Sequence, residues 1–163
     1  MKPTVDHLLV ASDFTAASAA AIEYAATLAR GLNAHLHLVH VLEQPFVASG
    51  PHEIVLPDTP ARREARYRAA FARLSRDAKV LADGVTASVE IREGDATHAI
   101  AQAAVDYGAG LIVLGTRGHR PFRHLFDDRV DRLTRIAGRP ILTVRELDGA
   151  RATSAAAGPE LAA

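Results

Sequence analysis

The sequence contains no cysteine, which excludes disulfide bonds, thiolate metal ligands and cysteine nucleophiles. Neither sign of charge is in excess, because nineteen Lys and Arg residues balance nineteen Asp and Glu residues. No global positive field would therefore draw the chain to nucleic acid or to an anionic membrane. Long apolar runs are also missing, so no segment reaches membrane-spanning length, and the N-terminal segment with its charged Asp6 is not typical of a signal peptide. We expect a cytoplasmic protein.

What is present is the composition of a globular domain. With 163 residues, of which 48% are hydrophobic and 23% charged, the chain is long enough for one well-buried domain, which we place at residues 1–146. Apolar, strand-like runs alternate with segments of helical spacing. This alternation predicts an α/β fold with a doubly wound parallel sheet, right-handed crossovers and helices on both faces. The segment 147–163 lacks apolar periodicity, and we expect a disordered tail.

Five strands are expected, and their hydrophobic patterns differ. The second and fourth are apolar on both faces, which predicts a central strand and a buried strand respectively. The third alternates polar and apolar residues, as a half-exposed edge strand does, and the last begins at a proline and should also be an edge. In chain order the five strands are expected at 6–12, 34–42, 85–92, 111–115 and 139–145.

Four helices should connect these strands. The first is alanine-rich and can be capped by Thr15. The second is long and amphipathic, and its apolar side is expected to include Tyr67, Phe71, Leu74, Ala78 and Leu81. Its other side is rich in arginine, which we interpret as a solvated face because aromatic stacking residues do not accompany the arginines. The third and fourth helices are expected at 94–108 and at about 127–136.

Ligands of doubly wound sheets bind beyond the carboxyl ends of the strands, where the strand order reverses. Here the segments at strand ends read ASDFT, HVLEQ and GTRG. In the third, Gly115 and Gly118 allow a tight turn whose amide groups can face an anion, and a helix N-terminus follows. A G-x-x-G spacing alone is equally typical of a plain connector between a strand and a helix. The spacings of a P-loop and of a dinucleotide fingerprint are not met.

The ordered segments LLVASDFT, HLHLVHVL, REGDATHAI, VLGTRG and RPILTVR resemble those of universal stress proteins, over roughly Val5 to Arg145. The resemblance implies a Rossmann-like, adenine nucleotide alpha hydrolase-like fold with a single five-stranded sheet in the order 3-2-1-4-5. It also implies a stress-response protein that forms a homodimer by antiparallel pairing of its last strand. Covering that edge with a second chain would also remove an exposed, unpaired strand.

In the nucleotide-binding branch of that family, G-x-x-G is followed after nine residues by G-S or G-T, and ATP occupies the strand-end cleft. By this resemblance, Asp13 would lie near the adenine and ribose and Val41 would contact the base. The phosphates would be lined by Gly115, Arg117 and Gly118. The candidate cofactor-binding residues are therefore Ala11, Ser12, Asp13, Val41, Gly115, Arg117, Gly118, Asp127, Asp128 and Arg129.

The second half of that motif is altered in this chain. Counting nine residues from Gly118 reaches Asp128-Arg129, and a one-residue deletion reaches Asp127-Asp128. Two carboxylates can cap an empty helix, but they oppose a triphosphate. A pair of like unit charges about 4 Å apart costs on the order of 4 kcal/mol at an effective dielectric constant near 20, or about a thousandfold in affinity. A bridging Mg²⁺ would reverse the sign of this effect.

Two functions stay open at this stage. The first is a homodimeric stress protein that acts through binding and interaction, with no catalytic residue and no metal, nucleic-acid or membrane site assigned. The second is an ATP-binding switch, to which a further, enzymatic alternative adds slow ATP hydrolysis, for which Asp13 and Asp127 are the only obvious metal ligands. Asp13 is otherwise interpreted as a cap of the next turn. Three nearby histidines, His35, His37 and His40, are interpreted as structural residues and not as zinc ligands.

Overall fold

The computed structural model describes residues 5–43, 59–116 and 123–145, and of residues 123–129 it describes the helix but not the side chains. The expected tail at 147–163 lies outside these residues. In chain order the elements are β1 (His7–Ala11), α1 (Ala16–Leu32), β2 (His35–Leu42), α2 (Pro60–Leu81), β3 (Ala87–Glu93), α3 (Ala96–Asp106), β4 (Leu111–Thr116), α4 (Arg123–Ala137) and β5 (Ile141–Arg145).

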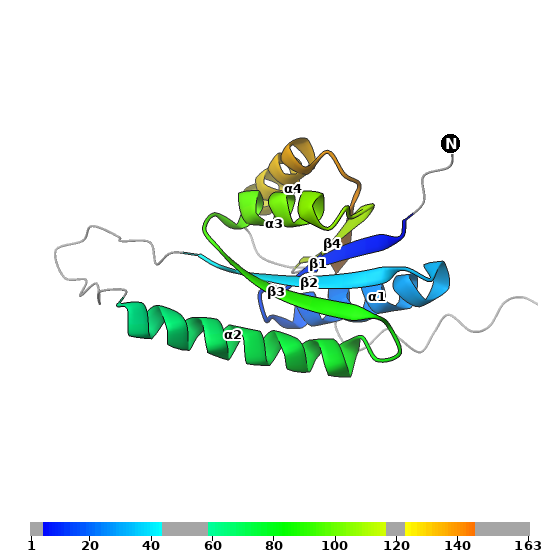
Figure 1. The fold of residues 1–163 in the computed structure, drawn as a ribbon. Helices are drawn as coiled ribbons and strands as arrows, with labels where there is room; N and C mark the ends of the chain where they lie inside the picture. The colour runs from blue at the N-terminus through cyan, green and yellow to red at the C-terminus, as the bar shows by residue number, and fades with distance from the viewer. Residues whose placement is uncertain (1–4, 44–58, 117–122, 146–163) are drawn as a thin grey trace, which may run out of the picture.

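The strands form one parallel sheet in the order β3-β2-β1-β4-β5, which confirms the expected fold class and strand order. Helices α1 and α2 cover one face of the sheet, and α3 and α4 cover the other (Figure 1). Because side chains alternate along a strand, β1 supplies both cores. Leu8 and Val10 are buried against α1 and α2, whereas Leu9 is buried in the cluster shared with α3 and α4.

Helix α1 begins and ends at well-defined capping residues. Its N-cap is Thr15, whose hydroxyl accepts from the backbone N–H of Ser18 while the Ser18 side chain accepts from the backbone of Thr15. At its other end Asn33 has the left-handed φ of 53° that closes many helices. The buried side of α1 is almost entirely alanine, with Ile22 as its one large side chain among the buried residues. Small side chains allow this helix to lie close to the sheet.

Two expectations about element positions need correction or refinement. The middle position of the sheet belongs to β1, and β2 is an interior strand beside it. Helix α4 begins at Arg123 and not near 127, so the Asp127-Asp128 pair lies in its second turn and does not cap it. Acidic residues ahead of an apolar stretch are typical of a helix start, and here this signal lies within the helix. The half-exposed edge character of β3 is confirmed.

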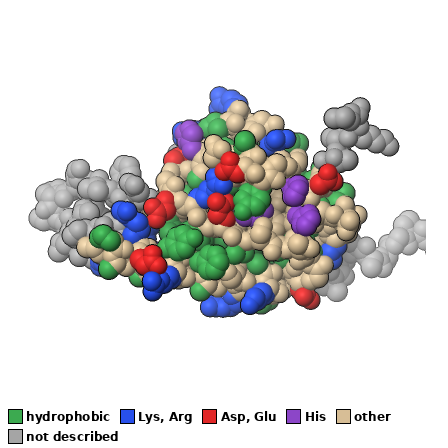
Figure 2. Space-filling view, in the orientation of Figure 1, with side chains coloured by type: hydrophobic (Ala, Val, Ile, Leu, Met, Phe, Trp, Pro, Cys, Tyr) green, Lys and Arg blue, Asp and Glu red, His purple; other side chains and the backbone are tan. Residues whose placement is uncertain are grey.

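The expected apolar side of α2 is only partly buried. Ala70 and Leu74 are buried, but Tyr67 and Phe71 keep 40% and 43% of their surface exposed. The first turns of α2 extend past the carboxyl end of β2 (Figure 1), so the sheet does not cover them. Figure 2 shows hydrophobic side chains along this helix beside Lys and Arg side chains. Ala70 is buried between these two exposed residues, so periodicity identified the helix but not which side of it packs.

Among the described residues, no helix is both long and apolar enough to cross a bilayer.

Candidate functional site

A cleft with a volume of about 380 Å³ opens at the carboxyl ends of β1, β2 and β4. The chain passes from β1 outward to β2 and β3, and later returns to place β4 on the other side of β1. The strand order thus reverses between β1 and β4, and the connections diverge there and leave a crevice. The first turn of α3 and the second half of α4 complete its walls.

Half of the ten sequence-predicted binding residues line this cleft. They are Ala11, Ser12, Asp13, Val41 and Gly115.

The other predicted residues are not seen lining the cleft. Arg117 and Gly118 lie outside the described residues, and Asp127, Asp128 and Arg129 lie in the part of α4 whose side chains are not described. Val130, which follows them directly, does line the cleft. The altered motif therefore belongs to the helix that forms one wall of the site.

The loop after β1 is held by its own side chains. The backbone N–H of Ser12 donates to the carbonyl of Val39 over 2.9 Å, which extends the pairing of β1 with β2 by one residue. Asp13 Oδ1 accepts from the backbone N–H of Thr15 over 3.1 Å and from the Thr15 hydroxyl. The interpretation of Asp13 as a cap of the next turn is confirmed. Its carboxylate is positioned at the cleft by this turn.

Phe14 has a backbone conformation that residues with side chains rarely adopt, with φ at 62°, which costs on the order of 1–3 kcal/mol. Its ring is held from two sides. His40 of β2 stacks on it with ring centroids 4.1 Å apart, and the guanidinium of Arg73 lies 4.5 Å from its centroid. Arg73 also donates to the Phe14 carbonyl over 2.9 Å. Helix α2 thereby fixes the loop that forms the cleft floor.

His40 itself lines the cleft and was not singled out for it by sequence reasoning. Its Nδ1 lies 2.7 Å from the carbonyl oxygen of Ser12. A carbonyl can only accept, so Nδ1 carries the proton, and in the neutral imidazole Nε2 is then an acceptor. The Nε2 atom of His40 can therefore accept a hydrogen bond from an amino or hydroxyl group of a ligand.

Gly115 has a packing role that the sequence did not reveal. A Cβ atom placed on it would clash with the backbone carbonyl of Ala17 and would lie 2.6 Å from the backbone nitrogen of Ser18. The absence of a side chain therefore lets β4 touch the first turn of α1. The glycine was predicted as part of a phosphate loop; in the structure it sets the distance between a strand and a helix N-terminus at the cleft.

Helix α3 contributes a wall that sequence reasoning also missed. Its N-cap Asp95 accepts from the backbone N–H of His98 over 3.0 Å and from the His98 ring over 2.8 Å. These hydrogen bonds lower the pKa of Asp95. Thr97 and Ile100 then lie on the cleft. The capping pattern of Asp95 marks a helix start, but only the fold places that start at the same sheet edge as Asp13.

The three histidines of β2 do not form a metal site. Among the described residues, no group of three or more His, Asp and Glu side chains is placed to hold a metal ion. His35 and His37 share one face of β2, where His35 stacks on His7 with centroids 5.4 Å apart and His37 is buried. His40 lies on the other face and contacts Phe14. Each ring thus has a different structural contact.

A parallel five-stranded sheet with a cleft at its strand-order reversal defines a Rossmann-like α/β protein. The chain belongs to the universal stress protein family, whose match covers residues 4–145. It is 30% identical over 143 residues to Universal stress protein A homolog 1 of Coxiella burnetii (strain RSA 493 / Nine Mile phase I), and the matched region covers 85% of this chain and 94% of that protein.

Solved structures share the fold. A universal stress protein in complex with cAMP has a TM-score of 0.63 and 16% sequence identity, over 88% of this chain and 99% of that one. A universal stress protein family protein from Arabidopsis thaliana with AMP bound has a TM-score of 0.55 and 15% identity, over 91% of this chain and 97% of that one. These similarities confirm the fold, and the two relatives hold cAMP and AMP respectively.

Replacing Gly115 with alanine should destabilise the protein by about 1–3 kcal/mol, because the new methyl group overpacks the contact between α1 and β4. Gly31→Ala is the matched control. Gly31 lies inside α1 with open space around its Cα, so alanine there should stabilise by about 0.5–1 kcal/mol. Urea denaturation measures both changes. An unchanged free energy of unfolding for Gly115→Ala would show that the close approach is not maintained in solution.

Proposed function

We propose that this protein is a stress-response protein that acts by binding an adenine nucleotide in the strand-end cleft, and that binding, not turnover, is its activity. The observation that carries the proposal is the cleft itself. Its volume of about 380 Å³ lies within the range of small-ligand sites, and it opens at the one edge of the sheet where this fold class places ligands. The cAMP and AMP complexes of two structural relatives support the choice of ligand.

The side chains around the cleft fit such a ligand. Val41, Ile100 and Leu133 provide apolar walls suited to a flat purine ring. His40 offers its Nε2 atom as a hydrogen-bond acceptor beside them, and the Asp13 carboxylate can accept a hydrogen bond from a ribose hydroxyl. Oδ1 of Asp13 already accepts two hydrogen bonds from Thr15, which favours a positioning role over metal-assisted hydrolysis.

The number of phosphates is the feature we expect this chain to select. Asp127 and Asp128 stand in the second turn of α4, three and two residues before the cleft residue Val130. Carboxylates near the end of a phosphate chain repel it, and the repulsion grows with the charge of the ligand. We therefore propose that AMP or a cyclic monophosphate binds better than ATP, and that Mg²⁺ reduces the difference.

Calorimetric titration with AMP should give a Kd on the order of micromolar. Val41→Trp should weaken AMP binding by about tenfold or more, because the larger ring fills the space proposed for the base. Val80→Trp is the control, since Val80 is 68% exposed on α2 and does not line the cleft. No heat with millimolar AMP, or equal affinity for both variants and the wild type, would refute the proposed site.

The double variant Asp127→Gly with Asp128→Ser should increase ATP affinity by about tenfold relative to AMP affinity, because it removes two negative charges and restores the small pair. Asp131→Ser is the control, because it removes a carboxylate from the same helix outside the motif. The measurement is the ratio of the two Kd values for each protein without Mg²⁺. If the wild type, the double variant and Asp131→Ser all gave the same ratio, the aspartates would not face the phosphates.

We further propose that the protein is a homodimer through β5. This strand pairs with β4 on one side, and no other described strand pairs with its second side. The backbone N–H of Ile112 in β4 donates to the carbonyl of Pro140. In a parallel pair the backbone groups of alternate residues point to the same neighbour, so the N–H and C=O groups of the even-numbered residues of β5 point to β4. The N–H of Thr143 therefore points to the open edge, where an antiparallel copy could accept it.

Thr143→Pro should dissociate the dimer, because it removes an outward donor while leaving the pairing with β4 in place. Thr143→Val keeps the N–H and should remain dimeric. Light scattering of both variants and the wild type at micromolar concentration gives the masses directly. A monomeric wild type, or a dimeric Thr143→Pro, would show that β5 is not the interface.

A further inference from the structure

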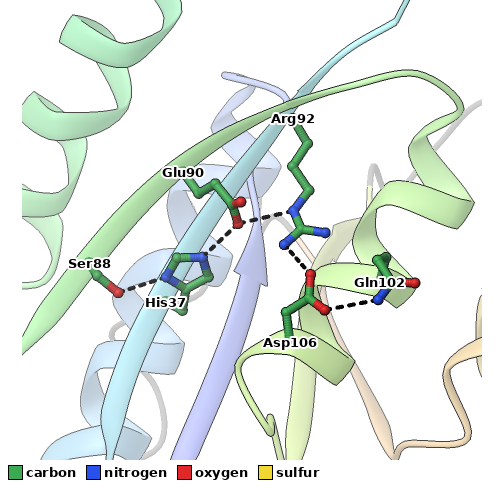
Figure 3. Close-up of polar contacts among 6 residues, drawn as sticks. All are labelled: His37, Ser88, Glu90, Arg92, Gln102 and Asp106. Carbon is green, nitrogen blue, oxygen red and sulfur yellow. Dashed lines mark hydrogen bonds and ion pairs between the residues drawn. The ribbon is translucent and has the colours of Figure 1, made fainter.

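Apart from the cleft, the most connected polar cluster among the described residues lies on β2 and β3 (Figure 3). The register pairs His37 of β2 with Ser88 of β3, and Glu90 follows two residues later on the same face of the sheet. Ser88 Oγ lies 2.7 Å from His37 Nδ1, and Glu90 Oε2 lies 3.3 Å from His37 Nε2. A hydroxyl, an imidazole and a carboxylate are thus joined in series by hydrogen bonds.

The protons in this series follow from the partners. An ionised carboxylate only accepts, so Nε2 of His37 carries the ring proton and donates it to Glu90. Nδ1 is then an unprotonated nitrogen that accepts from the Ser88 hydroxyl. His37 is only 3% exposed, and burial lowers its pKa, so the neutral ring is the form present at neutral pH. The imidazole therefore presents an unprotonated nitrogen to the serine hydroxyl and an N–H to the carboxylate, as a general base acting on a serine does, with the two ring nitrogens exchanged relative to the Ser-His-Asp triad.

The cluster is held rigidly by its neighbours. Tyr107, at the end of α3, stacks on the His37 ring with centroids 3.3 Å apart. Arg92 lies 3.0 Å from Glu90 Oε2 through Nε and 2.7 Å from Asp106 Oδ2 through a terminal nitrogen. The Nε contact is an ion pair without the alignment of a hydrogen bond. The carboxylate that orients His37 is therefore itself fixed by charge.

Access distinguishes this cluster from a buried structural network. Ser88 is exposed, although His37 behind it is buried. The backbone carbonyl of Thr86 and the backbone N–H of Gly94 form hydrogen bonds with β2. The backbone N–H and C=O groups of the even-numbered residues of β3 therefore point to β2. The N–H of Val89, directly after Ser88, therefore points to the open edge of the sheet. This donor points away from β2, whereas the Ser88 hydroxyl points toward His37 on β2, so access to the cluster comes from the exposed Ser88 itself.

We propose that Ser88, His37 and Glu90 form a nucleophilic site that accepts acyl groups from small activated esters. The Ser88 oxygen bonds to the ester carbonyl carbon as its proton moves to His37 Nδ1. The bond to the leaving alkoxide then breaks, and the alkoxide takes that proton. In the second half of the reaction, water bonds to the carbonyl carbon of acylated Ser88 as its proton moves to His37 Nδ1. The bond to the Ser88 oxygen then breaks, that oxygen takes the proton back, and the carboxylic acid is released. The substrates are small because neither Ser88 nor His37 lines a described cleft.

The proposal is independent of nucleotide binding, since none of the three residues lines the strand-end cleft. The probe is p-nitrophenyl acetate in excess over the protein, followed in the pre-steady state, and then peptide mass spectrometry for an acetyl group on Ser88. We expect a burst of p-nitrophenol and acetylated Ser88 in the wild type, and loss of both in Ser88→Ala. Ser88 is exposed, so this variant should fold normally, which circular dichroism checks.

Two further variants separate activation from simple exposure. Thr86→Ala removes the hydroxyl of an exposed residue directly before β3, two positions ahead of Ser88, and it should leave the burst unchanged. Glu90→Gln keeps the side-chain shape but loses the charge that orients His37, and it should slow acylation by about tenfold or more. A burst of equal size in Ser88→Ala, or acetyl groups spread over lysines and other hydroxyls with none favoured on Ser88, would overturn the proposal.

Discussion

The contact between the first turn of α1 and β4 is the constraint on which the rest of the structure depends. It exists because Gly115 has no side chain and because the facing side of α1 is alanine. With that spacing fixed, the N-terminus of α1 lies at the carboxyl end of β4, beside the reversal in strand order. The cleft is the space left between these elements, so its shape follows from a packing requirement and not from a ligand-specific loop alone.

The same cleft is stabilised from the second helix layer. The left-handed backbone at Phe14 would be unfavourable by itself, and it persists because His40 and Arg73 hold the ring from opposite sides. Arg73 belongs to α2, whose first turns extend past the sheet. A change in the position of α2 would therefore act on the loop that carries Asp13. This contact provides a physical route by which occupancy of the cleft could alter an exposed helix surface, as a binding protein without turnover requires.

The sequence predicts the elements well where the local pattern and the packing agree. The strand expected at 34–42 is observed at 35–42, and the one at 111–115 extends by one residue. The strand order needed the family resemblance, since alternation of strands and helices does not determine it. Exposure of Tyr67 depends on which side of α2 faces the rest of the protein. The packing role of Gly115 depends on which helix faces β4. Neither is a property of a local segment, so periodicity and motif spacing could not reveal them.

Strand β2 shows how one interior strand can serve two sites. Buried polar groups are costly unless they are hydrogen-bonded, and the histidines on its two faces meet this requirement with different partners. His40 donates to the loop of the cleft, whereas His37 lies between Ser88 and Glu90 of the edge strand. Because the two rings point to opposite sides of the sheet, the proposed ligand site and the proposed nucleophilic site share a strand but no side chain. Their energetic coupling should accordingly be small, and a substitution on one face can test one site without disturbing the other.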